Sequence, residues 1–255
     1  MKYIYADIED INFISKKLKK NFSYIINLIN NLDHSNKKET YKNNYLALKN
    51  IVNFFLKKKI KLFIQIGSSL EYGNAKSPQQ EDFLGKPKSF FGTAKLLATK
   101  YLLNLFIKKR FPVTVLRIYN IYGPHQDINR FIPIVINSCK IKKNFPCSHG
   151  KQYKDFLYIS DLIEVLFLTM KSCCSVKGKI INIGYGKPIQ IKNIIKNISN
   201  FYKSENAIFN KIKLRTEETL RVYPNLDKVK KILKWKAKIN FKTGLKKTIK
   251  FYNDN

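Results

Sequence analysis

The chain has 255 residues, 44% of them hydrophobic, which suffices for the core of one large domain or of a domain with a small lobe. Its formal net charge is +32, but only five of the 49 basic residues are arginines and the lysines are spread from Lys16 to Lys250. This pattern argues against a specific nucleic-acid-binding face and predicts only weak, salt-sensitive attraction to polyanions.

Other function classes are excluded by what the sequence lacks. No run of about 18 uncharged apolar residues is present, so we expect no membrane span. The first residues do not form a secretory leader, and the four cysteines and three histidines do not fall at metal-ligand spacing. We therefore expect a cytoplasmic protein without a structural metal.

Short apolar runs rich in β-branched and aromatic residues alternate with longer helical patterns. Strands are predicted over residues 3–6, 24–28, 62–66, 113–119 and 179–183. Helices are predicted over residues 46–57, 93–108, 161–170, 189–202 and 226–233. The acid that opens the third of these helices, Asp161, suits a positive helix N-terminus. Strands separated by helices predict an α/β fold with a parallel sheet covered on both faces.

Six segments carry a resemblance to a known family. They are IGSSLEYG (66–73), FGTAK (91–95), LRIYNIYGP (116–124), GKQYKDFLYISDL (150–162), INIGYGKPI (181–189) and RTEETLRVYPNLDKVKKILKW (215–235). In residues, order and spacing they resemble the extended short-chain dehydrogenases, the NAD-dependent epimerase/dehydratase family that acts on nucleotide sugars. The resemblance covers nearly the whole chain.

The resemblance implies a catalytic set at three positions. In the family a tyrosine exchanges a proton with a sugar hydroxyl, and a Ser or Thr contacts the same sugar oxygen. A lysine one helical turn after the tyrosine lowers the phenol pKa and holds the nicotinamide ribose of the cofactor. By position these are residue 91, Lys95 and Ser68. Residue 91 is Phe91, which cannot exchange a proton, so we expect a rate loss of about 10²–10⁴-fold. Tyr72 is expected to be structural.

Two further positions narrow the implied reaction. Ser69 and Leu70 stand where the 4,6-dehydratase branch of the family has an Asp-Glu pair that performs the elimination. Neither residue carries a carboxylate, so the resemblance favours 4-epimerisation or 4-keto reduction over dehydration.

On the substrate side the family pattern is better kept. Asn120 matches an Asn that contacts the sugar nucleotide, and Arg215 matches an Arg that binds its diphosphate. Lys154 stands where the family usually has an Arg, which keeps the charge but loses bidentate phosphate contact. Asp161 matches a structural acid near the site.

On the cofactor side the pattern is damaged. The 255 residues contain no Gly-x-x-Gly-x-x-Gly turn, and the first residues resemble the family's third strand, with Asp7 and Ile8 near the adenine. Asn44 matches a family Asn, whereas Ile29 and Asn30 stand where small residues normally let the cofactor pass. We therefore expect NAD or NADP as the cofactor, with impaired binding.

These observations together predict a Rossmann-like doubly wound parallel sheet that lacks its first βαβ unit, with a small substrate lobe. The Rossmann-like part is expected over about 1–124 and 150–185, and the lobe over about 125–149 and 186–255. The absence of two strands would leave the predicted strand 3–6 without a neighbour and would bare one edge of the strand 24–28.

Three functions remain open. The first is an impaired NAD(P)-dependent nucleotide-sugar epimerase or 4-keto reductase. The second is a non-catalytic remnant that binds a sugar nucleotide or a partner, and the third, less favoured, is a basic polyanion-binding protein. The resemblance also implies a homodimer formed through the helix 93–108.

Overall fold

The structure, a computed structural model, describes residues 3–5, 7, 10, 14, 16–18, 21–30, 36–83, 85–215 and 218–254. The chain forms two compact units. The first comprises Met1–Ala75, Glu81–Arg117 and Leu168–Ile181, and the second comprises Lys76–Gln80, Ile118–Phe167 and Asn182–Asn255. None of the described helices is both long and apolar enough to cross a membrane.

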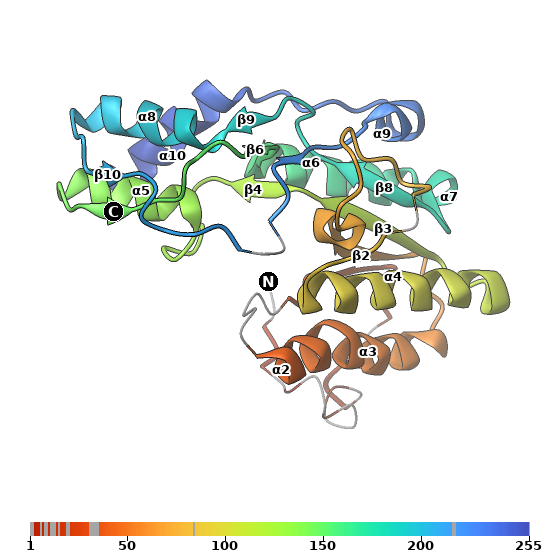
Figure 1. The fold of residues 1–255 in the computed structure, drawn as a ribbon. Coiled ribbons are helices and arrows are strands. Elements are labelled where there is room, and N and C mark those ends of the chain that lie inside the picture. Colours follow the sequence, from red (N-terminus) through yellow and green to blue (C-terminus); the bar gives the residue numbers. More distant parts are fainter. Residues whose placement is uncertain are drawn as a thin grey trace. The chain divides into compact units, whose positions relative to one another are not determined.

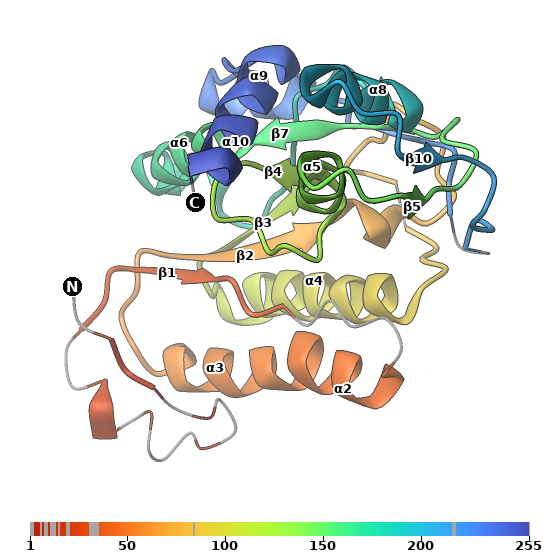
Figure 2. The ribbon, with the colours of Figure 1, turned by 90° about the vertical axis from the view of Figure 1, so that its left-hand side faces the viewer.

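The main sheet has four strands in the order β1-β2-β3-β8. Their bounds are β1 Tyr24–Asn27, β2 Leu62–Ser68, β3 Val113–Ile118 and β8 Ile180–Ile183. The edge strand β1 pairs with β2 in parallel register, with Tyr24 opposite Leu62 (Figure 2). Strand β2 is buried along nearly its whole length, as expected for an inner strand of a parallel sheet.

The helices of the first unit cover one face of β1 and β2 (Figure 2). A helical segment runs through α2 Lys37–Tyr41, the π-helical turn η1 Lys42–Leu46 and α3 Ala47–Leu56, and lies beside α4 Phe90–Lys109 (Figure 1). Their apolar faces form a core with the strands that includes Leu48, Val52, Phe63, Leu102 and Val115. The 3₁₀ turn η2 Ser69–Tyr72 follows β2, and the short α7 Cys173–Val176 precedes β8.

The second unit contains three small sheets. Their strands are β4 Asn120–Tyr122, β5 Phe145–Pro146, β6 Tyr153–Lys154, β7 Phe156–Tyr158, β9 Ile189–Gln190, β10 Ala207–Ile208 and β11 Arg221–Val222. Strand β4 pairs with β7, β5 with β10, and β6 lies between β9 and β11. The helices of this unit are α5 Phe131–Lys140, α8 Ile191–Tyr202, α9 Asp227–Leu233 and α10 Phe241–Asp254, and α6 Ile159–Lys171 begins in it.

The second unit has its own core, in which buried residues of α5, α8 and α10 pack together with residues of β4 and β7. Its members include Tyr122, Ile136, Phe156, Ile195 and Leu245.

The α/β fold and the parallel sheet predicted from the sequence are confirmed, and four of the five predicted strands correspond to β1, β2, β3 and β8. The predicted strand over 3–6 is wrong where the structure describes it, because residues 3–5 are not in a strand. Tyr3 and Tyr5 are 68% and 89% exposed. A strand needs a hydrogen-bonded neighbour, and no described residue supplies one here.

Several predicted helices begin earlier than expected. The helix predicted over 46–57 continues a helical segment that starts at Lys37, where the Asn36 side chain caps the Glu39 amide at 3.0 Å. Helix α6 begins at Ile159, so Asp161 lies within its first turn. The sequence interpretation missed α5 and α10; in α10 the apolar positions Phe241, Leu245 and Ile249 repeat every four residues between lysines. The expected lobe boundaries stay a prediction.

Candidate active site

Ser68 lies where β2 ends, as predicted, and it begins the turn η2. Its Oγ accepts a hydrogen bond from the Leu70 amide at 3.2 Å, and its own amide donates to Glu71 Oε1 at 2.8 Å. This reciprocal arrangement is a capping box. The Leu70 amide occupies one lone pair of Oγ, so the Ser68 hydroxyl keeps its proton and one lone pair for a further hydrogen bond.

The Glu71 carboxylate beneath Ser68 is fully buried and connects three elements. Glu71 Oε2 accepts hydrogen bonds from Thr99 Oγ1 of α4 at 2.8 Å and from Arg117 Nε of β3 at 2.9 Å. Burial raises the pKa of Glu71, whereas the positive charge of Arg117 opposes that rise. A Cβ atom at Gly67 would lie 2.6 Å from Glu71 Oε1, so the glycine leaves room for the carboxylate.

The sequence interpretation missed Glu71, although two signals pointed to it. The pattern Ser68-x-x-Glu71 has capping-box spacing, and Arg117 stands inside an apolar strand, where a buried cation requires a partner.

Helix α4 carries the other two predicted catalytic positions. The helix begins after Ser89, whose Oγ accepts from the Gly92 amide at 3.1 Å. Phe91, Lys95 and Thr99 follow one another at four-residue intervals and are all buried on one face. The structure therefore brings Phe91 and Lys95 together, with the Phe91 ring centroid 5.7 Å from Lys95 Nζ.

The Lys95 ammonium is held by main-chain carbonyls of β2 and of the segment that follows β1. Nζ donates to the Ile66 carbonyl at 3.2 Å and to the Ile29 carbonyl at 3.3 Å. Burial lowers the pKa of Lys95 to about 8, and the nearby Glu71 carboxylate opposes the shift. A charged lysine lowers the pKa of a neighbouring phenol, but position 91 has no phenol.

Tyr72 does not replace the missing phenol. It is fully buried, and its ring lies 4.4 Å from the Arg117 guanidinium carbon. This packing agrees with the structural role expected from the sequence.

The predicted cofactor-binding residues fall into three situations. Asn44 is buried within η1, where its Nδ2 donates to the Thr40 carbonyl at 2.9 Å. Asp7 is exposed, and its carbonyl accepts from the Asp10 amide at 3.1 Å. Ile8 lies outside the described residues.

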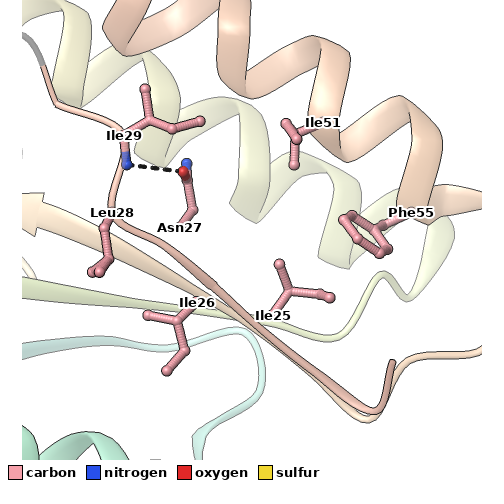
Figure 3. A pocket seen from close by; sticks show the side chains of 7 residues that line it. All are labelled: Ile25, Ile26, Asn27, Leu28, Ile29, Ile51 and Phe55. Atoms are coloured by element: carbon pink, nitrogen blue, oxygen red, sulfur yellow. Dashed lines mark hydrogen bonds between the residues drawn. The ribbon is translucent and has the colours of Figure 1, made fainter. Parts of the chain in front are cut away.

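An open apolar groove of about 450 Å³ runs beside β1 and α3. Figure 3 shows that Ile25, Ile51 and Phe55 face one another along it, whereas Ile26 and Leu28 point to the other side of the strand. Asn27 Oδ1 accepts from the Ile29 amide at 3.1 Å, which fixes the turn after β1. Ile29 is thus part of the groove wall; that it stands where the family has a small residue stays a prediction.

The predicted substrate-side residues all belong to the second unit. Asn120 Nδ2 donates to the Asp155 carbonyl at 2.8 Å, so Asn120 lies next to the residue that follows Lys154. Lys154 Nζ forms an ion pair with Glu218 at 2.5 Å, and the Glu218 amide donates to the Arg215 carbonyl at 3.0 Å. The positions predicted to be catalytic, Ser68, residue 91 and Lys95, belong to the first unit.

Two buried carboxylates organise the second unit. The Asp155 carboxylate accepts from the Tyr185 amide at 2.8 Å and the Gly186 amide at 2.5 Å, and burial raises the pKa of Asp155 to about 6. Asp161 accepts from the amides of Lys238 and Ile239 at 3.2 and 3.0 Å. The sequence interpretation anticipated a structural Asp161 but missed Asp155. A signal was present, because an acid directly before the apolar run 156–158 is expected to need hydrogen-bond donors when it is buried.

Comparisons with known proteins agree with this architecture. The profile of the NAD dependent epimerase/dehydratase family matches residues 2–184. Human dTDP-D-glucose 4,6-dehydratase is 27% identical over 206 residues, which are 77% of this chain and 58% of that relative, so the match spans little more than half of the relative's length.

Solved structures match almost the whole chain. An epimerase from Methanothermobacter thermautotrophicus superposes with a TM-score of 0.92 at 18% identity, covering 99% of this chain and 78% of the other. A Tyr-to-Phe variant of UDP-glucuronic acid 4-epimerase from Bacillus cereus, in complex with UDP-4-deoxy-4-fluoro-glucuronic acid and NAD, superposes with a TM-score of 0.90 at 22% identity, covering 98% and 81%. At these identities the structures establish the fold alone. With the profile match over most of its length, the chain belongs to the NAD-dependent epimerase/dehydratase family.

Proposed function

We propose that the chain binds a nucleotide sugar on the framework of an NAD(P)-dependent 4-epimerase or 4-keto reductase, with an impaired chemical step. The observation that carries this proposal is the buried face of α4, where Phe91 precedes Lys95 by one turn and its ring lies 5.7 Å from the ammonium. Ser68 supplies a hydroxyl whose oxygen is positioned by the Leu70 amide. The set therefore offers a donor and a cation to a sugar oxygen but no side chain that takes its proton.

The lack of an accessible carboxylate near Ser68 favours epimerisation or keto reduction over dehydration. Ser69 and Leu70 carry no carboxylate, and Leu70 is 41% exposed. Glu71, the carboxylate of this segment, is fully buried and accepts hydrogen bonds from Thr99, Arg117 and the Ser68 amide. A carboxylate held in this way has no access to a sugar carbon, so an elimination lacks its acid and base.

The engagement of Lys95 favours a second candidate, binding without turnover. Two of the three ammonium protons already donate to the carbonyls of Ile29 and Ile66. Ile29 also adds a branched side chain to the groove beside β1. The Bacillus cereus Tyr-to-Phe variant, which holds NAD and a sugar nucleotide, supports the idea that the loss of a phenol leaves binding intact in this fold.

Calorimetry on the chain as it exists tests the proposal. Titration with UDP- and dTDP-sugars is expected to give a measurable dissociation constant, and the Asn120→Ala and Arg215→Ala variants are expected to weaken it. NAD and NADP are each expected not to bind at micromolar concentration. No heat with any nucleotide sugar would refute the binding function, whereas tight NAD binding together with turnover would refute the impairment.

A homodimer formed through α4 is part of the proposal. Helix α4 exposes the apolar side chains of Phe90, Leu97 and Ile107, with 52%, 37% and 69% of their surface accessible. Light scattering is expected to give twice the mass of one chain, and a Leu97→Lys variant is expected to shift the mass to that of the monomer.

A further inference from the structure

The Lys154 ammonium is already occupied by protein groups. Nζ lies 2.5 Å from Glu218 Oε1 and donates to the Thr219 carbonyl at 2.9 Å, so two of its three protons are engaged. The strand pairing holds this arrangement in place, because Lys154 of β6 stands opposite Val222 of β11, four residues after Glu218. The pair is therefore set by the sheet as well as by the side chains.

This ion pair is better shielded from solvent than the other lysine pairs among the described residues. The Lys154 and Glu218 side chains are 17% and 26% exposed. The Lys238–Glu164 pair is 64% and 33% exposed, and the Lys230–Asp227 pair is 59% and 79% exposed. Because shielding from water strengthens an electrostatic interaction, the Glu218 carboxylate attracts the Lys154 ammonium more strongly than a fully exposed acid would.

Glu218 also lies close to Arg215 along the main chain. Its amide donates to the Arg215 carbonyl at 3.0 Å. The acid that pairs with Lys154 therefore belongs to the same turn of chain as Arg215, which the proposed function assigns to the ligand.

We infer that Glu218 is a specificity-determining residue that competes with the phosphate groups of the ligand for Lys154. The inference rests on the proposed function and on the family resemblance, by which Lys154 keeps the charge of a phosphate-binding Arg. In the resting chain the carboxylate neutralises the ammonium, and a phosphate oxygen binds there only when it displaces Glu218 or accepts repulsion from it. The site is therefore expected to bind phosphate and diphosphate groups more weakly than its positive charges alone would predict.

The test uses Glu218→Gln, which keeps the size and one acceptor of the side chain but removes the charge. The probes are inorganic pyrophosphate, UDP and UDP-glucose, titrated calorimetrically at one fixed ionic strength. Glu218→Gln is expected to bind the diphosphate probes about 10-fold more tightly, from Coulomb's law across a few ångströms of partly screened space. Adding Lys154→Ala to Glu218→Gln is expected to abolish the gain.

Glu164→Gln is the matched control, since it changes the net charge equally and also removes the partner of a lysine in the second unit. It is expected to leave the affinities unchanged. An equal gain in Glu164→Gln, a gain that survives Lys154→Ala, or no gain in Glu218→Gln would each overturn the inference. If pyrophosphate gains and no nucleotide sugar binds any variant, the proposed function fails and the competition at Lys154 stands. If wild type and Glu218→Gln bind UDP-glucose equally, only the competition fails.

Discussion

The Lys95 ammonium donates to the main-chain carbonyl of Ile29 at 3.3 Å, so the lysine of the FGTAK motif is tied to the segment that follows the edge strand β1. The family resemblance aligns Ile29 with a small residue and Phe91 with a tyrosine. Both of these positions therefore contact the same ammonium, Ile29 through its carbonyl and Phe91 through its ring.

The stability of the protein is expected to depend on Lys95 at alkaline pH. Burial lowers the pKa of Lys95 to about 8, below the ordinary 10.5, so between these values the unfolded chain binds more protons than the folded one. The contribution of Lys95 therefore becomes more favourable as pH rises, by about 1.5 kcal/mol between pH 8 and 9.5. Urea unfolding of wild type and Lys95→Met across this range measures the difference; parallel curves would contradict it.

Phe91→Tyr is expected to create a phenol whose titration is coupled to that of Lys95. The new hydroxyl would lie one turn from the Lys95 ammonium, which is charged below a pH of about 8, so its absorbance near 295 nm should not titrate as an isolated tyrosine with a pKa of about 10. Phe90→Tyr adds the same phenol at a neighbouring position that is 52% exposed, and it should titrate ordinarily. Identical titrations of the two variants would mean that position 91 does not face Lys95.

The same variant is also expected to change turnover where cofactor is bound. A proton-transfer group contributes about 10²–10⁴-fold to rate. Joined to an upstream Gly-rich βαβ unit, Phe91→Tyr should convert nucleotide sugars, followed by NMR of the sugar C4 proton, whereas Phe90→Tyr should not. Equal, negligible rates in both would place the impairment elsewhere than at position 91.

Glu71→Gln is expected to destabilise the first unit by about 3–5 kcal/mol, because the variant leaves the buried Arg117 without a counter-charge. Glu164→Gln, which breaks an exposed pair, should cost less than about 1 kcal/mol. Denaturant unfolding measures both. The paired replacement Glu71→Val with Arg117→Leu should recover much of the loss; if it does not, the carboxylate contributes mainly through Ser68 and Thr99.

The free energy of unfolding is expected to depend on Asp155 at acidic pH. Burial raises the pKa of Asp155 from 3.8 to about 6, so between these values the folded protein binds more protons than the unfolded chain. The contribution of Asp155 is greatest below pH 3.8 and falls by about 3 kcal/mol as pH rises to about 6. Asp155→Asn should remove this component when unfolding is compared at pH 4 and pH 6. An unchanged difference would assign the dependence to other acids.

The sequence predicted local features well. The strands β1, β2, β3 and β8 followed from short apolar runs. The roles of Ser68 and Lys95 came from the family resemblance and stay a prediction. The sequence did not predict partners distant along the chain, since Glu71 binds residues 28 and 46 positions away and Lys154 binds a carbonyl 65 positions away. The strand over 3–6 failed for the same reason, because pairing is a property of the neighbour as much as of the strand.

The π-helical turn η1 makes the chain length locally adjustable. A π-turn corresponds to one residue more than an α-helical turn accommodates, so deletion of a single residue from Lys42–Leu46 would allow an uninterrupted α-helix from Lys37 to Leu56. Because the wide turn already absorbs the extra residue, α2 and α3 would keep nearly their present faces after this deletion. A deletion inside α3 would instead rotate everything before it by about 100°, so a deep mutational scan should tolerate single deletions in η1 better than single deletions in α3.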